Sequence, residues 1–194
     1  MKISQSKIEQ LENCLREYCK PLYERLLPAM SQKQIDSYFK LWKVDDENLL
    51  KIFHWKNGIA YDHIYPTHSF DYTGFGVIPT LEYINEVKTS QIDKLWRTSL
   101  FPLILSFGGD FLLYETDKQS SNYGQLFLYS PSLGYVDYQP GYFDSIETLI
   151  DTLCENFKRG IFKYDTQNMS LEINFEMLIK TSRQFNPKSE YWEG

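Results

Sequence analysis

Two histidines and two aspartates lie close together in one polar stretch, and they are the residues best suited to bind a metal ion. They are Asp62, His63, His68 and Asp71. Imidazole and carboxylate groups are ordinary ligands of zinc, and a metal held there would support a hydrolase. Their spacing matches no common zinc motif, because the sequence has no HExxH, and both residue types are frequent in loops. We therefore expect polar loop residues and keep a metal-dependent hydrolase as a remote alternative.

Other enzyme signatures are incomplete or missing from the sequence. The run Gly74-Phe75-Gly76 lacks the third glycine of a dinucleotide-binding loop, and neither a GxxxxGK[ST] nor a GxSxG motif occurs. Cys14, Cys19 and Cys154 fall on predicted helices, where we expect unreactive core residues rather than a disulfide framework or a nucleophile. The sequence thus predicts a non-enzymatic protein with no catalytic residues, no metal and no cofactor.

The charged residues are distributed unevenly along the chain. The 194 residues have a net charge of −6, but no Lys or Arg occurs between Lys56 and Lys88 or between Lys118 and Lys158. These two base-free windows contain nine acidic residues and nine of the 15 tyrosines. Nucleic-acid binding requires Lys and Arg to contact the phosphates, so we do not expect nucleic acid to bind there.

We interpret the base-free windows as one partner-binding face, because tyrosine is enriched where proteins meet and acids attract a basic partner. The aspartates would guide the approach and the tyrosines would anchor the partner. The predicted contact residues are Asp62, Tyr65, Asp71, Tyr72, Tyr135, Asp137 and Tyr142. The alternative is that the tyrosines are simply strand formers and that many of the acids cap helices. The sequence leaves both interpretations open.

The cellular compartment is predicted from what the chain lacks. No apolar run approaches the length of a membrane span, and the charged N-terminal stretch has no apolar core like that of a signal peptide. The hydrophobic fraction of 42% is typical of a globular protein. We therefore expect a cytoplasmic protein that does not bind membranes.

Apolar residues at helical spacing predict three helices in the first 58 residues. Capping residues place their starts at Ser6 with Glu9, at Ser31 with Gln34, and at Asp45 or Asp46. The third helix is expected to end at Asn57-Gly58, because a glycine in the left-handed conformation lets the chain turn away. Further helices are expected from Pro79, from Asp144 with Glu147, and after Ser170.

Alternating apolar residues and glycine turns predict two hairpins in the middle of the chain. One joins strands 101–107 and 111–115 through Gly108-Gly109-Asp110, and the other joins strands 125–130 and 135–138. Both faces of strand 125–130 are apolar, so we expect it to be covered on both sides. The pattern predicts an α+β fold with a central antiparallel β-sheet flanked by helices and with an N-terminal helix.

These elements and their turn residues resemble the SUKH superfamily, in its Smi/Knr branch. The resemblance rests on the Trp-x-Asn-Gly of residues 55–58, the Gly-Gly-Asp hairpin and the closing Asn-Pro…Tyr-Trp of residues 186–192. It covers about residue 30 to the C-terminus, which implies a SUKH-like domain at 30–194 with a helix from 1–29 packed on it. The residues given structural roles are Trp55, Asn57, Gly58, Gly108, Gly109 and Asp110. Trp55 is expected to pack, Asn57 to tolerate an unusual turn and Gly58 to end the helix.

The resemblance implies a protein that works by binding another protein. Bacterial members of the superfamily are mostly immunity proteins that neutralise toxins, often nucleases, whereas fungal relatives regulate cell-wall assembly through protein contacts. We therefore expect an immunity protein whose partner is a basic toxin domain. The alternative is an intracellular regulatory scaffold that binds an endogenous protein. The resemblance carries over no catalytic residues.

Overall fold

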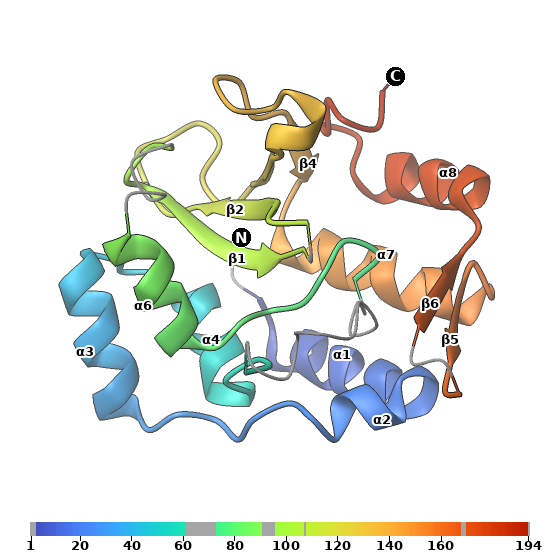
Figure 1. Ribbon diagram of the computed structural model, residues 1–194, viewed down its shortest axis with the longest axis horizontal. Coiled ribbons are helices and arrows are strands. Elements are labelled where there is room, and N and C mark those ends of the chain that lie inside the picture. The colour runs from blue at the N-terminus through green and yellow to red at the C-terminus, as the bar shows by residue number, and fades with distance from the viewer. Residues whose placement is uncertain (1–2, 61–72, 91–95, 107, 168–169, 194) are drawn as a thin grey trace.

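The computed structural model of the protein describes residues 3–60, 73–90, 96–106, 108–167 and 170–193 (Figure 1). The helices are α1 (Gln5–Tyr18), α2 (Lys20–Tyr23), α3 (Gln32–Trp42), α4 (Glu47–Trp55), α6 (Leu81–Thr89), α7 (Ile146–Lys158), α8 (Phe175–Phe185) and the short 3-10 helix η2 (Pro131–Leu133). The strands are β1 (Leu100–Leu105), β2 (Phe111–Glu115), β3 (Leu126–Tyr129), β4 (Gly141–Phe143), β5 (Phe162–Asp165) and β6 (Ser170–Ile173). Within these ranges, no helix combines the length and apolar character needed to cross a lipid bilayer.

Four strands form one antiparallel sheet in the order β1-β2-β3-β4, and β5 pairs with β6 in a separate hairpin. Side chains on β3 alternate between two apolar clusters. Leu126 and Leu128 enter the main core, while Phe127 and Tyr129 enter a smaller cluster with Trp96 on the opposite face. All four β3 residues are buried. The predicted α+β class and the two-sided cover of this strand are therefore confirmed.

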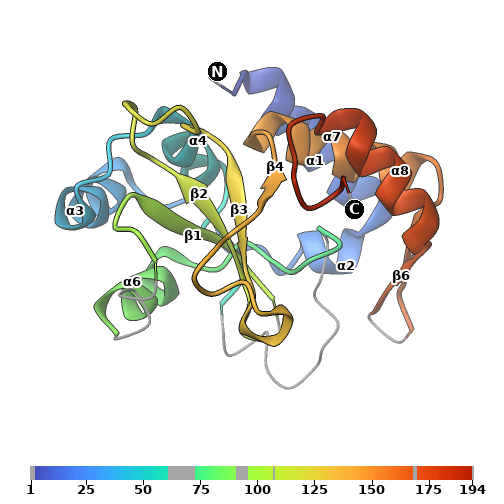
Figure 2. The ribbon, with the colours of Figure 1, turned by 90° about the horizontal axis from the view of Figure 1, so that it is seen from above.

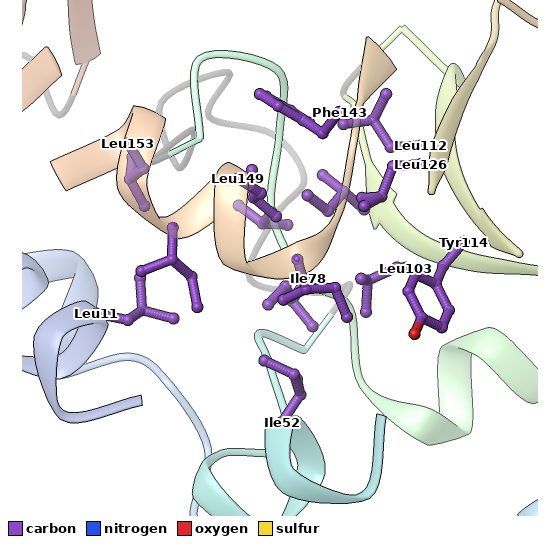
Figure 3. Close-up of a cluster of buried hydrophobic side chains, with 14 of the residues drawn as sticks. Leu11, Ile52, Ile78, Leu103, Leu112, Tyr114, Leu126, Phe143, Leu149 and Leu153 are labelled. Atoms are coloured by element: carbon purple, nitrogen blue, oxygen red, sulfur yellow. The ribbon is translucent and has the colours of Figure 1, made fainter. Parts of the chain in front are cut away.

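The main core lies between the sheet and helices α1, α4 and α7 (Figures 1 and 2). Figure 3 shows side chains from distant segments converging there, among them Leu11 of α1, Ile52 of α4, Leu103 of β1 and Leu149 of α7. Burying these apolar groups is the main source of stability for the arrangement. The N-terminal helix shares this core with the rest of the chain, and the division at residue 30 stays a prediction.

Two predicted helix starts are confirmed in atomic detail. Ser31 caps α3 in a capping box with Gln34, in which each side chain accepts a hydrogen bond from the other residue's backbone amide. Asp46, rather than Asp45, caps α4 by accepting from the amides of Asn48 and Leu49. Both caps satisfy amides that have no partner within their own helix.

Three other predicted helix starts are wrong by one or two residues. The observed caps are Ser4 in place of Ser6 for α1, Thr80 after Pro79 for α6, and Ser145 with Thr148 in place of Asp144 with Glu147 for α7. In each case the cap is a hydroxyl that accepts from the amide three residues later. Asp144 instead accepts from the amide of Lys188 in the C-terminal tail. Sequence spacing alone could not identify which neighbouring oxygen reaches the helix.

The predicted strand 135–138 is also wrong. After β3 the chain turns through η2 and Gly134, and only a single bridge joins Ser130 to Tyr135. The strand that pairs with β3 is β4, where Leu126 lies opposite Phe143 and Phe127 opposite Gly141. The predicted turn at residues 131–134 is present, but the chain then leaves the sheet and rejoins it only at β4.

The last helix begins later than predicted, because a hairpin precedes it. Residues after Ser170 form β6, which pairs with β5 from Phe162↔Ile173 to Asp165↔Ser170. Helix α8 then starts at Phe175, with Asn174 as its cap accepting from the amide of Met177. The hairpin is half-exposed along most of its length, so it carries little of the apolar alternation that predicts a strand.

Candidate partner-binding surface

The loop between β3 and β4, residues 130–140, carries exposed apolar and aromatic side chains and stands out from the sheet (Figures 1 and 2). Leu133 is 59% exposed and Tyr138 is 58% exposed, while Tyr135 and Val136 are half-buried. Large apolar side chains gathered on one exposed loop mark a contact site more often than single ones do. This loop is therefore a candidate site for contact with a partner.

Aromatic rings of the C-terminal tail hold the base of this loop in place. The ring of Tyr135 contacts that of Tyr191 at 6.3 Å between centroids, and Tyr191 in turn packs on Tyr142 at 4.6 Å. The indole of Trp192 packs on Tyr142 at 4.7 Å and donates a hydrogen bond of 2.8 Å to its carbonyl oxygen. Aromatic pairs of this kind add to stability beyond the area that they bury. The exposed loop is thus held in position by packed aromatic rings at its base.

Tyr142 does not serve as the exposed anchor that the sequence predicted. It is only 6% exposed, because it lies on β4 beneath Tyr191 and Trp192 and also contacts Phe75. A side chain so covered has little surface left for a partner, and its position in the main core gives it a packing role. Tyr135 and Asp137, from the same prediction, are half-buried and exposed respectively.

Two acidic residues border the exposed rings. Asp137 is exposed within the loop, and Glu190 from the tail accepts hydrogen bonds from the Tyr138 hydroxyl and from the amide of Gly141. The hydrogen bond to Glu190 raises the pKa of Tyr138, so its hydroxyl stays protonated and positioned as a donor. We call Leu133, Tyr135, Asp137, Tyr138, Glu190 and Tyr191 the aromatic surface.

The rest of the predicted contact set lies outside the described residues. Asp62, Tyr65, Asp71 and Tyr72 all belong to residues 61–72, so their placement beside the aromatic surface stays a prediction. The metal-ligand candidates His63 and His68 fall in the same range. In the ranges that the structure does describe, no group of three or more His, Cys, Asp or Glu side chains gathers as a metal site.

In the Trp-x-Asn-Gly segment, Trp55 packs against the main core as predicted, but Asn57 and Gly58 act differently from the prediction. Helix α4 already ends at Trp55, which is half-buried and donates a 3.0 Å hydrogen bond to Glu12. Asn57 is 5% exposed, and its side-chain oxygen accepts from the amide of Leu81 at the start of α6. Asn57 therefore ties two helices together, a role that only the tertiary structure reveals.

Gly58 is required for close packing rather than for ending the helix. Its φ of +69° is in the left-handed region, and a Cβ placed on it would lie 2.4 Å from the carbonyl oxygen of Ile78. The neighbouring backbone is fixed, since Leu27 donates to the Gly58 carbonyl and Ile59 donates to that of Ile78. Only glycine allows this approach without strain.

The Gly-Gly-Asp segment lies in the turn between β1 and β2, as predicted. Gly109 has a φ of +84°, and the Ser106 hydroxyl oxygen accepts from the amides of Gly108 and Asp110. A hydroxyl that binds two turn amides stabilises a tight connection between antiparallel strands. The segment therefore shapes the hairpin.

Four members of the aromatic surface lie outside the predicted contact set: Leu133, Tyr138, Glu190 and Tyr191. The sequence does not indicate that Glu190 contacts this loop, because Glu190 is distant from it along the chain. Comparison of the chain with protein-family models and with curated proteins finds no match.

Proposed function

We propose that this chain is a non-enzymatic protein-binding module of the SUKH type, most specifically a cytoplasmic immunity protein that neutralises a toxin domain. The observation that carries the proposal is the aromatic surface, where Leu133 and Tyr138 are more than half exposed beside Asp137 and Glu190. Tyrosine and apolar anchors next to acids are the composition of a protein interface for a basic partner. Nuclease toxins are basic because they bind phosphate, so they fit this composition.

The packed base of the aromatic surface supports the same conclusion. A loop held by Tyr135, Tyr191 and Trp192 loses less conformational freedom on binding than an unsupported loop would. The hydrogen bond from Tyr138 to Glu190 fixes one exposed ring in advance. Preorganised anchors of this kind favour stoichiometric, long-lived complexes, which is how an immunity protein must act.

The experiment is inhibition of the toxin domain encoded next to this gene, measured with Leu133→Asp combined with Tyr138→Ala. We expect affinity to fall about 30-fold or more, since losing a buried anchor costs about 2 kcal/mol. The matched control is Leu41→Asp on α3, because Leu41 is 64% exposed but lies in another part of the molecule (Figure 1). Equal inhibition by both variants and the wild type would contradict the proposed surface.

A second prediction separates electrostatic guidance from anchoring. Asp137→Lys is expected to slow association with a basic toxin and to reduce its salt dependence, while the dissociation rate and the melting temperature change little. Stopped-flow association at low and high salt measures both effects. Association that is unchanged at low salt would exclude Asp137 from the approach path.

The neighbouring gene also distinguishes the two classes of partner. Without a toxin gene beside this chain's own, the regulatory scaffold that binds an endogenous protein becomes the better assignment. In that case binding to the endogenous partner is measured with the same double variant, Leu133→Asp with Tyr138→Ala, and with the Leu41→Asp control. Stoichiometric metal in the purified protein, together with hydrolytic activity lost in chelator, would instead support the metal-dependent hydrolase.

A further inference from the structure

Helices α1 and α7 pack side by side in a register that is set by contacts near both ends of α1. Near the start of α1, Lys7 forms an ion pair with Asp151 in the middle of α7, and the Gln10 side chain donates to the same carboxylate at 3.2 Å. Near the end of both helices, the rings of Tyr18 and Phe157 stack at 5.6 Å between centroids. The side chains between these contacts that lie on the same side of each helix are therefore turned toward the other helix.

Two cysteines occupy the facing positions between those contacts. Cys14 lies on α1 between Gln10 and Tyr18, and Cys154 lies on α7 between Asp151 and Phe157. The Cys154 sulfur is 3.9 Å from the Gln10 carbonyl oxygen, one helical turn before Cys14, and the two thiols lie close enough to shift each other's pKa. The sequence predicted unreactive core thiols because nothing in it indicated this pairing.

The pair is open to solvent from one side. Cys14 is 6% exposed, but Cys154 is half-buried, and both line a groove of about 530 Å³ between α1 and α7. A groove of this size admits a small oxidant to the Cys154 sulfur. Cys19, the third cysteine, is fully buried and does not line this groove.

The surroundings make the two thiols chemically unequal. The contact with Cys14 lowers the pKa of Cys154, the Gln10 side chain and the charge of Lys7 act in the same direction, and burial and Asp151 oppose them. The pKa of Cys14 is raised by the Cys154 contact and by burial. Cys154, the more exposed of the two residues, is thus also the one more readily deprotonated, and a thiolate is the form that reacts with peroxides.

We propose that Cys14 and Cys154 are a redox-active pair that forms a disulfide between α1 and α7 when the protein meets a peroxide. The Cys154 thiolate attacks hydrogen peroxide, the O–O bond breaks, and a sulfenic acid and water result after protonation. The Cys14 thiol then attacks the Cys154 sulfur, the S–O bond breaks, and a disulfide and a second water form. Two thiols are oxidised by two electrons, and one peroxide is reduced. A small-molecule dithiol restores the starting state.

Peptide mapping tests the pairing directly, because trypsin separates the three cysteines. Cys14 falls on peptide 8–16, Cys19 on 17–25 and Cys154 on 119–158. After treatment of the folded protein with a small excess of hydrogen peroxide, we expect a mass loss of about 2 Da and a cross-link between peptides 8–16 and 119–158. Cross-links through peptide 17–25, disulfide-linked dimers, or sulfinic acid at Cys154 without a cross-link would each overturn the proposal.

Two serine variants test the order of the steps. Cys14→Ser should leave Cys154 at the sulfenic acid, which dimedone traps on peptide 119–158, whereas Cys154→Ser should prevent both the trapping and the cross-link. Cys19→Ser is the matched control and should cross-link like the wild type. In the Cys154→Ser variant, dimedone labelling of Cys14 as fast as the wild type is oxidised by peroxide would contradict the assignment of Cys154 as the reacting thiol.

Thermal unfolding tests whether the cross-link belongs to the native fold. A disulfide that joins distant parts of the chain without strain is expected to raise the melting temperature by about 5–15 °C, reversed by dithiothreitol. A fall in melting temperature on oxidation would show that the helices must separate for the bond to form, and would overturn the proposal.

Discussion

Asp46→Ala is expected to lower the free energy of unfolding by about 3–5 kcal/mol, a large part of the roughly 5–15 kcal/mol typical of a domain. The Asp46 side chain is fully buried and accepts four hydrogen bonds. One oxygen accepts from the amides of Asn48 at 2.8 Å and Leu49 at 3.0 Å. The other accepts from the hydroxyls of Tyr123 at 2.6 Å and Tyr114 at 3.2 Å.

The expected loss is large because several groups lose their partner together. The variant removes the cap of α4, worth about 1 kcal/mol, and leaves the hydroxyl of the buried Tyr114 and two helix amides without this acceptor. The pKa of Tyr114 is raised by burial and by the charge of Asp46, so its hydroxyl stays protonated and needs an acceptor. Asp46 thus links the N-terminus of α4 to β2 and to the turn that follows it.

The neighbouring residue supplies a matched control. Asp45 has the same side chain but is 89% exposed, and it pairs with Lys118 at 2.6 Å on the surface. Asp45→Ala is expected to cost at most about 1 kcal/mol, because exposed ion pairs contribute little. Urea unfolding of the wild type and both variants measures the difference. Similar losses for Asp45→Ala and Asp46→Ala would contradict the role given to the buried cap.

Gly58→Ala is expected to destabilise by about 2–5 kcal/mol. A residue with a side chain pays about 1–2 kcal/mol to adopt the left-handed conformation. The added Cβ would also lie 2.4 Å from the Ile78 carbonyl oxygen and 2.5 Å from that of Pro79, and both atoms belong to the backbone. Displacing packed backbone adds about 1–3 kcal/mol.

A second glycine separates strain from crowding. Gly134 also has positive φ, at +78°, but a Cβ there would meet nothing within 4 Å. Gly134→Ala should therefore cost only about 1 kcal/mol, the conformational strain less the gain from a stiffer unfolded chain. Chemical denaturation of the two variants gives the comparison. Equal losses of unfolding free energy in the two variants would mean that crowding of the added Cβ against residues 78–79 does not contribute to the destabilisation of Gly58→Ala.

Short-range features of this protein were determined by its sequence. The capping box of Ser31 and Gln34, a cap for α4 at Asp45 or Asp46, the glycine turn after β1 and the apolar residues on both faces of β3 all depend on residues a few positions apart. Their physical causes are local hydrogen bonds and the period of apolar side chains, which a sequence displays directly. These features were enough to predict an α+β fold.

Long-range pairings were decided only by the tertiary structure. Leu126 pairs with Phe143 rather than with the nearby residue 138, because the chain after η2 leaves the sheet before it returns as β4. Tyr142 is buried because the tail folds back over it, and Cys154 meets Cys14 because α1 and α7 pack in one register. Each of these contacts lowers the free energy only once distant segments have already come together. A single sequence shows residue types and their spacing, but it does not show which distant segment will pack over a given residue.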